Sequence, residues 1–524
     1  MGIDIERSIS KEAANYHAGT DDDTSRSSNK EELTFEWDSS VPKMGGGKVY
    51  PPMIKDPQRY MVDFDEDDHE FPQNFPLRKK VMLLLVTLLS CFSSLYSSSV
   101  LSVASTQLTK EFHVGSEVVT LCTSFFVFGY AAGPIVWGPV SEIYGRKKVI
   151  VPAFFIFTAF NFACATAKDL QTLLIGRFFA GLAAGAVMVV GPAIIADLFT
   201  HSVRGNIVCF FAMILFGAPM VSPIINGFIV KNHSLGWRWC QYISGIISAL
   251  CLALMAFLFE ETHPGTILSR KAHHLRQKTG NIFIYAENDK ISFTFGGIIT
   301  KVLTRPMHMF IVEPILLLMT IYNSFVFGLL YLFLTEIPLI FGPGGYNFSE
   351  GVSSLPYIGI ILGVEVGGAM NVFFEKRYLK KVADAGKLLP EERLIPMFIG
   401  SICLPIGIFW LSWAGQYHDK VHWIVPTIGN FPLGVGLICI FLPSLNFLIE
   451  CYLPCVASAL AANTFMRYGF GGSFPLFARQ MFKGIGIDWG GSLLAFFSIA
   501  LIPMPILFYK YGKLLREKSR FALK

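Results

Sequence analysis

Twelve apolar stretches dominate the pattern of hydrophobic and polar positions between about residue 80 and residue 509. An α-helix needs roughly 20 mostly apolar residues to cross the hydrocarbon of a bilayer. We predict membrane spans at about 81–105, 118–140, 149–167, 171–196, 205–230, 240–260, 308–334, 350–374, 394–414, 421–445, 450–476 and 487–509. The pattern therefore predicts an all-α membrane protein with twelve transmembrane helices.

Polar segments divide the chain between these spans. The first segment is polar and rich in acidic residues and serine, a composition typical of disorder. The longest polar interruption follows the sixth span and separates two six-helix halves. We expect a disordered cytoplasmic tail at 1–79, halves at 80–260 and 308–509, a cytoplasmic central loop at 261–307 and a cytoplasmic tail at 510–524.

The distribution of lysine and arginine predicts the orientation of the chain. These residues collect after the second, sixth, eighth and twelfth spans, and such loops face the cytoplasm in most membrane proteins. Two glycosylation sequons, Asn232-His-Ser and Asn347-Phe-Ser, fall in loops that this orientation places outside. We therefore take Asn232 and Asn347 as candidate glycosylation sites.

Composition narrows the classes of function. The chain is 52% hydrophobic and 15% charged, whereas ordinary soluble domains carry about a quarter charged residues. A net charge of +5 gives no indication of nucleic-acid binding. Most of the ten cysteines lie in apolar runs, where they act as small packing residues. We find no phosphate-binding loop, metal cluster or nucleophile constellation, and expect neither a cofactor nor an enzyme.

A glycine- and charge-containing string, GPVSEIYGRKKVI, connects the second and third spans. Gly138 permits close packing, Gly145 permits a tight turn, and Glu142 lies one helical turn before Arg146 in a basic cluster that includes Lys147. An ordinary basic turn is the simpler alternative. The string resembles the signature loop of the major facilitator superfamily, G-x-L-A-D-R-x-G-R-K, with glutamate in place of the aspartate.

This resemblance also concerns Asp197 at the end of the fourth span. It implies that Asp197 pairs with Arg146 and latches the outward-facing state. The alternative is that Asp197 merely begins the following loop.

The fourth span contains an arginine in the string LLIGRFFAGLAAG. A charge near the membrane interior costs about 2.5–3.5 kcal/mol, so Arg177 should face a wet cavity or a partner. The string is similar to the superfamily pattern L-x-x-x-R-x-x-x-G-x-x-A/G, whose arginine is tied to proton coupling in drug/proton antiporters. Alternatively, Arg177 lies near the outer end of its span and extends to water.

The fifth span contains GAPMVSPIING, which resembles the antiporter motif G-x-x-x-G-P-x-x-G-G. The residues before its two prolines are alanine and serine, and an asparagine replaces another glycine. This departure weakens the inference of antiport more than the inference of transport. The positions that fit a form of the motif are Gly217, Pro219, Pro223 and Gly227.

Further resemblances extend over about residues 75–524. They are carried by EETHPGTILSRKAHHLR, by RPMHMFIVEPILLLMTIYNSFVFGLLYLF and by SALAANTFMRYGFGGSFPLFARQMF. The chain resembles the fungal twelve-span drug/proton antiporter family, near its multidrug and polyamine exporters. This implies the major facilitator fold, in which the first, fourth, seventh and tenth spans line a central cavity.

Candidate cavity residues combine aromatic rings with a few hydrogen-bonding groups, which suits amphipathic or cationic solutes. For any single aromatic residue, helix packing is the simpler alternative. Glu365, in the middle of the eighth span, is a candidate proton carrier or an ion-pair partner of Arg467. The cavity candidates are Tyr96, Tyr322, Asn323, Tyr331, Asn430, Asn463 and Arg467.

Together these features predict a secondary active transporter that exports small organic solutes, such as drugs or polyamines, in exchange for protons. We expect a monomer in the plasma membrane, with the vacuolar membrane as the alternative. A proton-coupled importer of a small cationic solute and a solute sensor that does not transport are the alternative functions. A sensor would usually have a long cytoplasmic extension, and only about 15 residues follow the last span.

Overall fold

The computed structural model describes residues 60–65, 67–232, 234–279, 283–290 and 304–522. The chain forms two units, one of 64–267 and 291–524 and a smaller one of 1–63 and 268–290. Most of the predicted disordered tail, 1–59, lies outside the described residues. The first long helix begins at Leu77, two residues before the predicted end of that tail.

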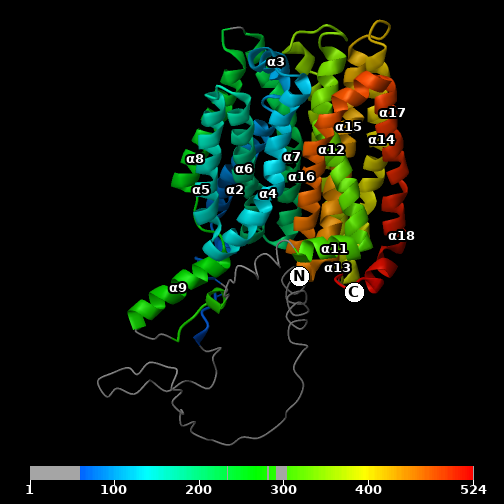
Figure 1. Cartoon of the computed structure of the whole chain (residues 1–524). Helices are drawn as coiled ribbons and strands as arrows, with labels where there is room; N and C mark the ends of the chain where they lie inside the picture. The colour runs from blue at the N-terminus through cyan, green and yellow to red at the C-terminus, as the bar shows by residue number, and fades with distance from the viewer. Residues whose placement is uncertain (1–59, 66, 233, 280–282, 291–303, 523–524) are drawn as a thin grey trace, which may run out of the picture. The chain divides into compact units, whose positions relative to one another are not determined.

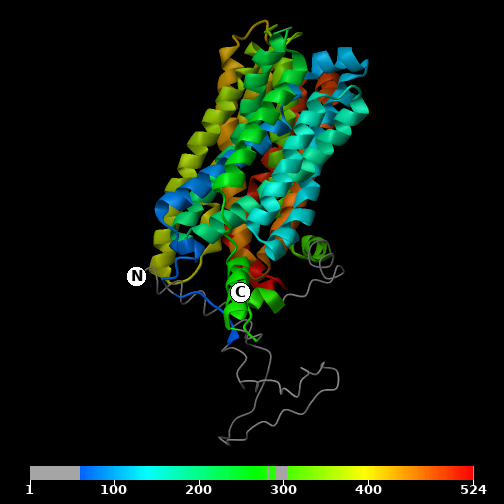
Figure 2. The same cartoon turned by 90° about the vertical axis from the view of Figure 1, so that its left-hand side faces the viewer.

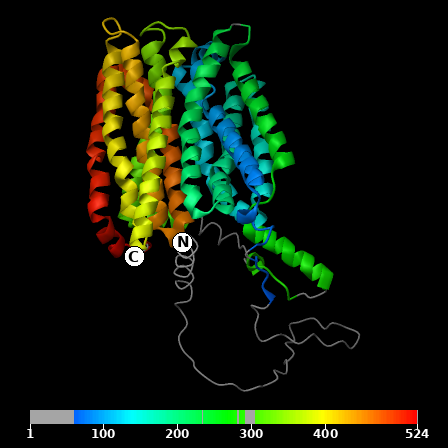
Figure 3. The same cartoon turned by 180° about the vertical axis from the view of Figure 1, so that it is seen from behind.

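The larger unit is a bundle of long helices whose first and second halves lie on opposite sides (Figures 1 and 3). The first half contains α2 (Leu77–Ser98), α3 (Ser105–Phe112), α4 (Ser116–Tyr144), α5 (Arg146–Ala165), α6 (Leu170–Leu198), α7 (His201–Lys231) and α8 (Gly236–Leu258). The second half contains α11 (Arg305–Val312), α12 (Pro314–Phe341), α13 (Tyr357–Ala385), α14 (Ile395–Gln416), α15 (Ile424–Cys451), α16 (Val456–Ile485), α17 (Ile487–Leu501) and α18 (Pro503–Lys518).

Eleven helical segments among the described residues are long and apolar enough to cross a membrane. They correspond to eleven of the twelve predicted spans, with α17 and α18 together forming the last. The remaining predicted span corresponds to α16, which has 30 residues but carries polar side chains such as Asn463 and Arg467. Because α16 packs against α4 and α12 inside the bundle, it completes the set of twelve.

Short 3-10 segments lie between several of the long helices. They are η2 (Pro72–Asn74), η3 (Ser102–Ala104), η4 (Glu287–Lys290), η6 (Val352–Ser354), η7 (Pro390–Leu394) and η8 (Leu453–Cys455).

The predicted central loop contains helical structure of its own. α9 (Pro264–Thr279) follows the first half. Within the smaller unit, the Val62 amide donates to the Tyr285 carbonyl at 2.9 Å, and Arg276 pairs with Asp289 at 3.1 Å. The segment 291–303 lies outside the described residues.

Glycines allow the closest helix pairs of each half to pack backbone against backbone. A Cβ on Gly133 of α4 would lie 2.8 Å from the Cα of Gly185 on α6. In the second half, a Cβ on Gly434 of α15 would lie 3.0 Å from the Cα of Gly363 on α13. Small residues permit this approach where two membrane helices cross, and the two halves use it between equivalent helices.

The two halves meet along α4 with α16 and along α7 with α13, and the long helices run side by side in the turned view of Figure 2. We call the end that contains the α4–α5 connection the inner end, and the opposite end the outer end. At the inner end a Cβ on Gly205 would lie 2.9 Å from Cδ of Glu375. At the outer end a Cβ on Gly227 would lie 2.6 Å from the carbonyl oxygen of Glu350. The halves are therefore in contact near both ends.

Candidate functional site

The connection between α4 and α5 is a sharp turn at Gly145. This residue has φ +94° and ψ 169°, a conformation that is essentially restricted to glycine. A Cβ at this position would lie 2.7 Å from Cδ of Glu261, and closer still to one of its oxygens. Gly145 therefore sets both the backbone turn and the approach of the Glu261 carboxylate.

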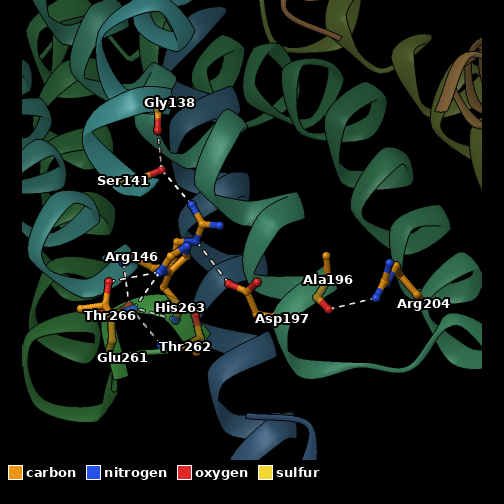
Figure 4. Close-up of polar contacts among 10 residues, drawn as sticks. All are labelled: Gly138, Ser141, Arg146, Ala196, Asp197, Arg204, Glu261, Thr262, His263 and Thr266. Atoms are coloured by element: carbon orange, nitrogen blue, oxygen red, sulfur yellow. Dashed lines mark hydrogen bonds and ion pairs between the residues drawn. The ribbon is translucent and has the colours of Figure 1, made fainter. Parts of the chain in front are cut away.

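Arg146, the first residue of α5, is buried at the inner end (Figure 4). Its Nε lies 3.2 Å from an oxygen of Asp197 at the end of α6, and its terminal nitrogen donates to the Ser141 hydroxyl at 2.9 Å. Its backbone amide donates to Glu261 at 2.7 Å. The structure thus brings Arg146 and Asp197 together, as the resemblance implied.

Glu261 is the acceptor around which this inner-end cluster is organised. One of its oxygens also accepts the backbone amides of Thr262, at 3.1 Å, and His263, at 3.0 Å. Burial and the nearby Arg146 charge lower the pKa of His263 to about 4, although the Glu261 carboxylate opposes this shift. The Thr266 amide donates to Nδ1 of His263 at 3.1 Å, which requires that nitrogen to be unprotonated.

A second buried charge cluster lies at the inner end of the other half. Arg393 in η7 lies between Glu375 of α13 and Glu450 of α15, with its Nε 2.8 Å from the Glu450 carboxylate. The Tyr378 hydroxyl donates to the other Glu450 oxygen at 2.7 Å, and the Tyr378 ring lies 3.9 Å from the guanidinium carbon. Each half therefore has one buried arginine joined to carboxylates of neighbouring elements.

Arg177 lies inside the first half and is completely buried. It donates to the backbone carbonyls of Cys122 at 3.0 Å, Ser97 at 2.8 Å and Ser98 at 2.7 Å, and it lies over the Phe126 ring. The last carbonyls of a helix receive no hydrogen bond from an amide of the same helix, and Ser98 is the last residue of α2. Arg177 therefore caps α2, and its partners are carbonyls rather than an acid.

The prolines of α7 create a second contact with the end of α2. Proline has no amide hydrogen, so Pro223 leaves the Pro219 carbonyl without its helical donor. The Ser99 hydroxyl donates to that carbonyl at 2.7 Å. Near this contact, Asn226 of α7 donates to the Tyr96 hydroxyl at 3.0 Å. No neighbouring atom lies within 4 Å of a Cβ built on Gly217, so packing does not require glycine there.

Several predicted cavity residues meet in the centre of the bundle. Tyr331 of α12 donates to the Ser98 hydroxyl at 3.0 Å and so links the two halves. The side-chain oxygen of Asn323 accepts from the Ser444 hydroxyl of α15 at 2.6 Å. Asn463 donates to a threonine hydroxyl of α12 at 3.3 Å. Arg467 lies near three aromatic rings, and Tyr322 is completely buried on α12.

Comparison with known proteins identifies the family. Residues 87–475 match the model of the Major Facilitator Superfamily. This chain belongs to the major facilitator superfamily.

Relatives of this superfamily member cover most of its length. The major facilitator superfamily multidrug transporter FLU1 of Candida albicans is 49% identical over 92% of this chain and 79% of its own. The multidrug transporter TPO1_2 of Candida glabrata is 44% identical over 92% of this chain and 83% of its own. These identities agree with the resemblance found in the sequence.

Solved structures of the superfamily share the fold. The xylose transporter XylE from E. coli has a TM-score of 0.57 and 18% identity, covering 82% of this chain and 99% of that one. A peptide transporter POT in complex with sulfate has a TM-score of 0.60 and 13% identity, covering 88% of this chain and 99% of that one. The chain is accordingly an all-α, multi-pass membrane transporter.

Some predicted residues of this transporter lie away from the buried clusters and the centre. Glu365 is exposed on a face of α13 that also exposes Leu362 and Val366, and it forms no ion pair with Arg467 among the described residues. Asn430 donates to the carbonyl of Pro356 at 3.0 Å, and thus joins α15 to the start of α13.

In the signature loop, Glu142 is exposed and Lys147 is half-buried. The ion pair of Arg146 is therefore formed with Asp197 and not with Glu142. A Cβ on Gly138 would lie 3.7 Å from Val189, an ordinary contact, so close packing does not require glycine there.

The two sequons lie at the outer end of the transporter with exposed asparagine side chains. Asn232 directly follows α7, and its side-chain oxygen accepts from the Ser234 hydroxyl at 2.7 Å. Asn347 lies in the loop after α12 and has φ +57°. Both positions are open to modification.

Sequence reasoning missed three acids of this transporter as site residues: the buried Glu261 and Glu336 and the half-buried Glu375. Glu261 lies within the string EETHPG, which is part of the family resemblance and could have marked it as a site residue. Glu375 directly precedes the basic residues Lys376 and Arg377. Glu336 of α12 is completely buried, and one oxygen accepts from the Ser412 hydroxyl at 2.7 Å. Its other oxygen has no partner among the described residues.

Proposed function

We propose that this transporter exports small organic solutes such as drugs, in exchange for protons, as a monomer of the plasma membrane. The observation that supports alternating access is the contact of the two halves near both ends, while each half is held together at the inner end by its own arginine cluster. The direction of transport and the drug-like substrate class are supported by the relatives, which are named multidrug transporters.

Each inner-end cluster joins elements of one half, so that the half can move as one body when the inner end opens. Arg146 connects the start of α5 with the end of α6, and Glu261 connects α5 to the segment before α9. Arg393 connects α13, α15 and the start of α14. An arginine that loses its carboxylates is left as an unpaired charge, so these contacts keep the elements of each half together while the halves move.

Glu336 is better placed than Glu365 to carry the coupled proton. A carboxylate without a basic partner is costly to bury as an anion, and an ionisable group inside a membrane protein is a functional candidate by default. Glu336 meets both conditions, whereas Glu365 is exposed on the outside of α13. In this scheme Glu336 binds a proton when it is buried and releases it when water reaches it.

The test measures accumulation of labelled solutes, including spermidine and a lipophilic drug, in cells with and without the transporter. We expect lower accumulation of at least one solute only while the proton gradient is present. The Glu336→Gln variant should lose this gradient-driven export, while Glu117→Gln, an exposed acid at the outer end, should keep it. Export that a protonophore leaves unchanged would rule out proton coupling.

The same cells test the proposed membrane. A fluorescent fusion of the full chain should label the cell periphery. Labelling of the vacuolar boundary instead would contradict the plasma-membrane assignment and support the alternative.

A further inference from the structure

Arg467 on α16 is a buried cation in the centre of the bundle, and no described residue forms a hydrogen bond with it. It is 7% exposed. Its guanidinium carbon lies 5.1 Å from the ring centre of Phe327, 4.9 Å from that of Phe441 and 4.7 Å from that of Tyr468. It forms no hydrogen bond or ion pair with any residue that the structure describes, and its buried Nε is unpartnered. This differs from Arg177, whose guanidinium donates to three carbonyls.

The surrounding rings stabilise the charge of Arg467 but do not use its donors. Cation–π attraction acts through the ring faces, while the guanidinium carries five N–H groups that need acceptors. A buried charge with unused donors is costly. The planar fork of arginine matches a carboxylate with two parallel hydrogen bonds. The unused donors therefore indicate a ligand that brings its own acceptors.

Two tyrosine hydroxyls beside Arg467 also have no hydrogen-bonding partner in the described part of the chain. Tyr468 follows Arg467 directly, and its ring lies 5.2 Å from that of Tyr130 on α4, across the contact between the halves. Neither hydroxyl has a hydrogen-bonding partner among the described residues. The same small region thus holds several unused donors and a positive charge between apolar rings.

No acid in the described part of the second half forms an ion pair with Arg467. Glu336 accepts from α14, Glu365 is exposed, and Glu450 pairs with Arg393 at the inner end. A polycation such as spermidine would need carboxylates at the centre. An anionic aromatic solute could interact at one place with the Arg467 charge, with the unused N–H and O–H donors and with the aromatic rings.

We propose that Arg467 binds the carboxylate of an aromatic organic acid, whose ring packs among Phe327, Phe441 and Tyr468. This inference rests on the proposed export function and names the substrate class of its central site. It replaces the expectation of a cationic solute with that of an amphipathic organic anion. Arg467 acts as a binding and specificity-determining residue, since it touches the solute and keeps its own proton throughout.

The test compares three solutes that share one ring system: naphthoate, the neutral naphthamide and the cationic naphthylmethylamine. Binding of each labelled solute is measured on the purified full chain. We expect Arg467→Gln to weaken naphthoate binding about tenfold or more, because a charge-assisted hydrogen bond is lost. Its binding of naphthamide should change by less than about twofold, since the ring contacts remain.

Two further variants make the comparison specific. Arg467→Lys keeps the charge but not the fork, and should bind naphthoate with intermediate affinity. Arg479→Gln removes the same charge from the outer part of the same helix, and should leave all three affinities unchanged. Size-exclusion profiles check that each variant is folded. If Arg467→Gln does not fold, the test relies on Arg467→Lys. If Arg467→Lys loses the same affinity for naphthoate as for naphthamide, the inference is overturned.

Export by the reconstituted full chain separates this inference from the proposed function. If the wild type exports naphthamide or naphthylmethylamine on a proton gradient but neither binds nor exports naphthoate, the anion site is wrong and the export function stands. If Arg467-dependent naphthoate binding is found without export of any solute, the anion site stands and the export function is wrong. Tighter wild-type binding of naphthylmethylamine than of naphthoate would also overturn the inference.

Discussion

Replacing Gly145 with alanine is expected to destabilise the inner end of the first half. The native backbone, at φ +94° and ψ 169°, lies in a region that costs other residues about 1–3 kcal/mol. The added Cβ would also lie 2.7 Å from Cδ of Glu261, so the carboxylate must move. That movement lengthens the 2.7 Å bond from the Arg146 amide. A hydrogen bond to a charged group contributes about 1.5–3 kcal/mol.

The two effects of Gly145→Ala together amount to about 2.5–6 kcal/mol. Gly138→Ala is the matched control, because it adds the same methyl group to the same string. Its Cβ would lie 3.7 Å from Val189 within the helix α4, where alanine is favoured over glycine by about 0.5–1 kcal/mol. The two substitutions should therefore differ clearly, although the family motif contains both glycines.

The assay is thermal unfolding of the purified transporter in detergent. We expect the melting temperature of Gly145→Ala to fall by several degrees and that of Gly138→Ala to stay near wild type. A double-mutant cycle with Glu261→Ala separates strain from the clash, since the clash disappears without the carboxylate. Equal melting temperatures for wild type and Gly145→Ala would show that the turn or the Glu261 contact is wrongly placed. If the destabilisation of the double variant equals the sum of those of Gly145→Ala and Glu261→Ala, the Cβ at position 145 does not clash with the Glu261 carboxylate.

Three further outcomes are expected. Arg177→Met should lower stability by about 2–4 kcal/mol in thermal unfolding, with Arg177→Lys between it and wild type, because carbonyls at the end of α2 lose their donors. Acidification from pH 6.5 to about 4 should lower the free energy of unfolding, since the unfolded chain then protonates His263 while the folded pKa is about 4; His263→Gln should show a flatter dependence, and an unchanged slope would contradict this assignment. Asn232→Gln and Asn347→Gln should each increase gel mobility, and neither shift would appear if these loops faced the cytoplasm.

The membrane spans were predictable because length and apolar composition are local properties of the chain. The same rule recognises α16 only weakly, since its Asn463 and Arg467 face the interior and lower its hydropathy. α9 was missed for the opposite reason, because a polar helix outside the membrane leaves no apolar signal. Both elements follow from tertiary or surface context that a hydropathy pattern does not contain.

A contact between site residues was predictable only where both residues belong to a known sequence motif. Arg146 and Asp197 belong to such a motif, but Glu261 lies 115 residues from Arg146, and spacing alone does not connect them. The sequence also did not indicate on which face of its helix Glu365 lies, and therefore whether it is buried. In a membrane helix the lipid-facing and core-facing positions are both apolar, so neighbours such as Leu362 and Val366 do not indicate which face is buried. Glu336, on the buried face of α12, was therefore passed over.

In the proposed scheme, different residues carry out proton coupling and solute binding. Arginine keeps its proton in proteins, so neither Arg177 nor Arg467 carries the coupled proton. Arg177 is held by the carbonyls at the end of α2, and the Ser98 hydroxyl in that turn accepts from Tyr331 of α12. Glu336 lies on α12 as well, five residues further along. Protonation of Glu336 would thus act on the helix that contacts the Arg177 cap, and Arg177 would affect coupling by holding α2 in place rather than by titrating.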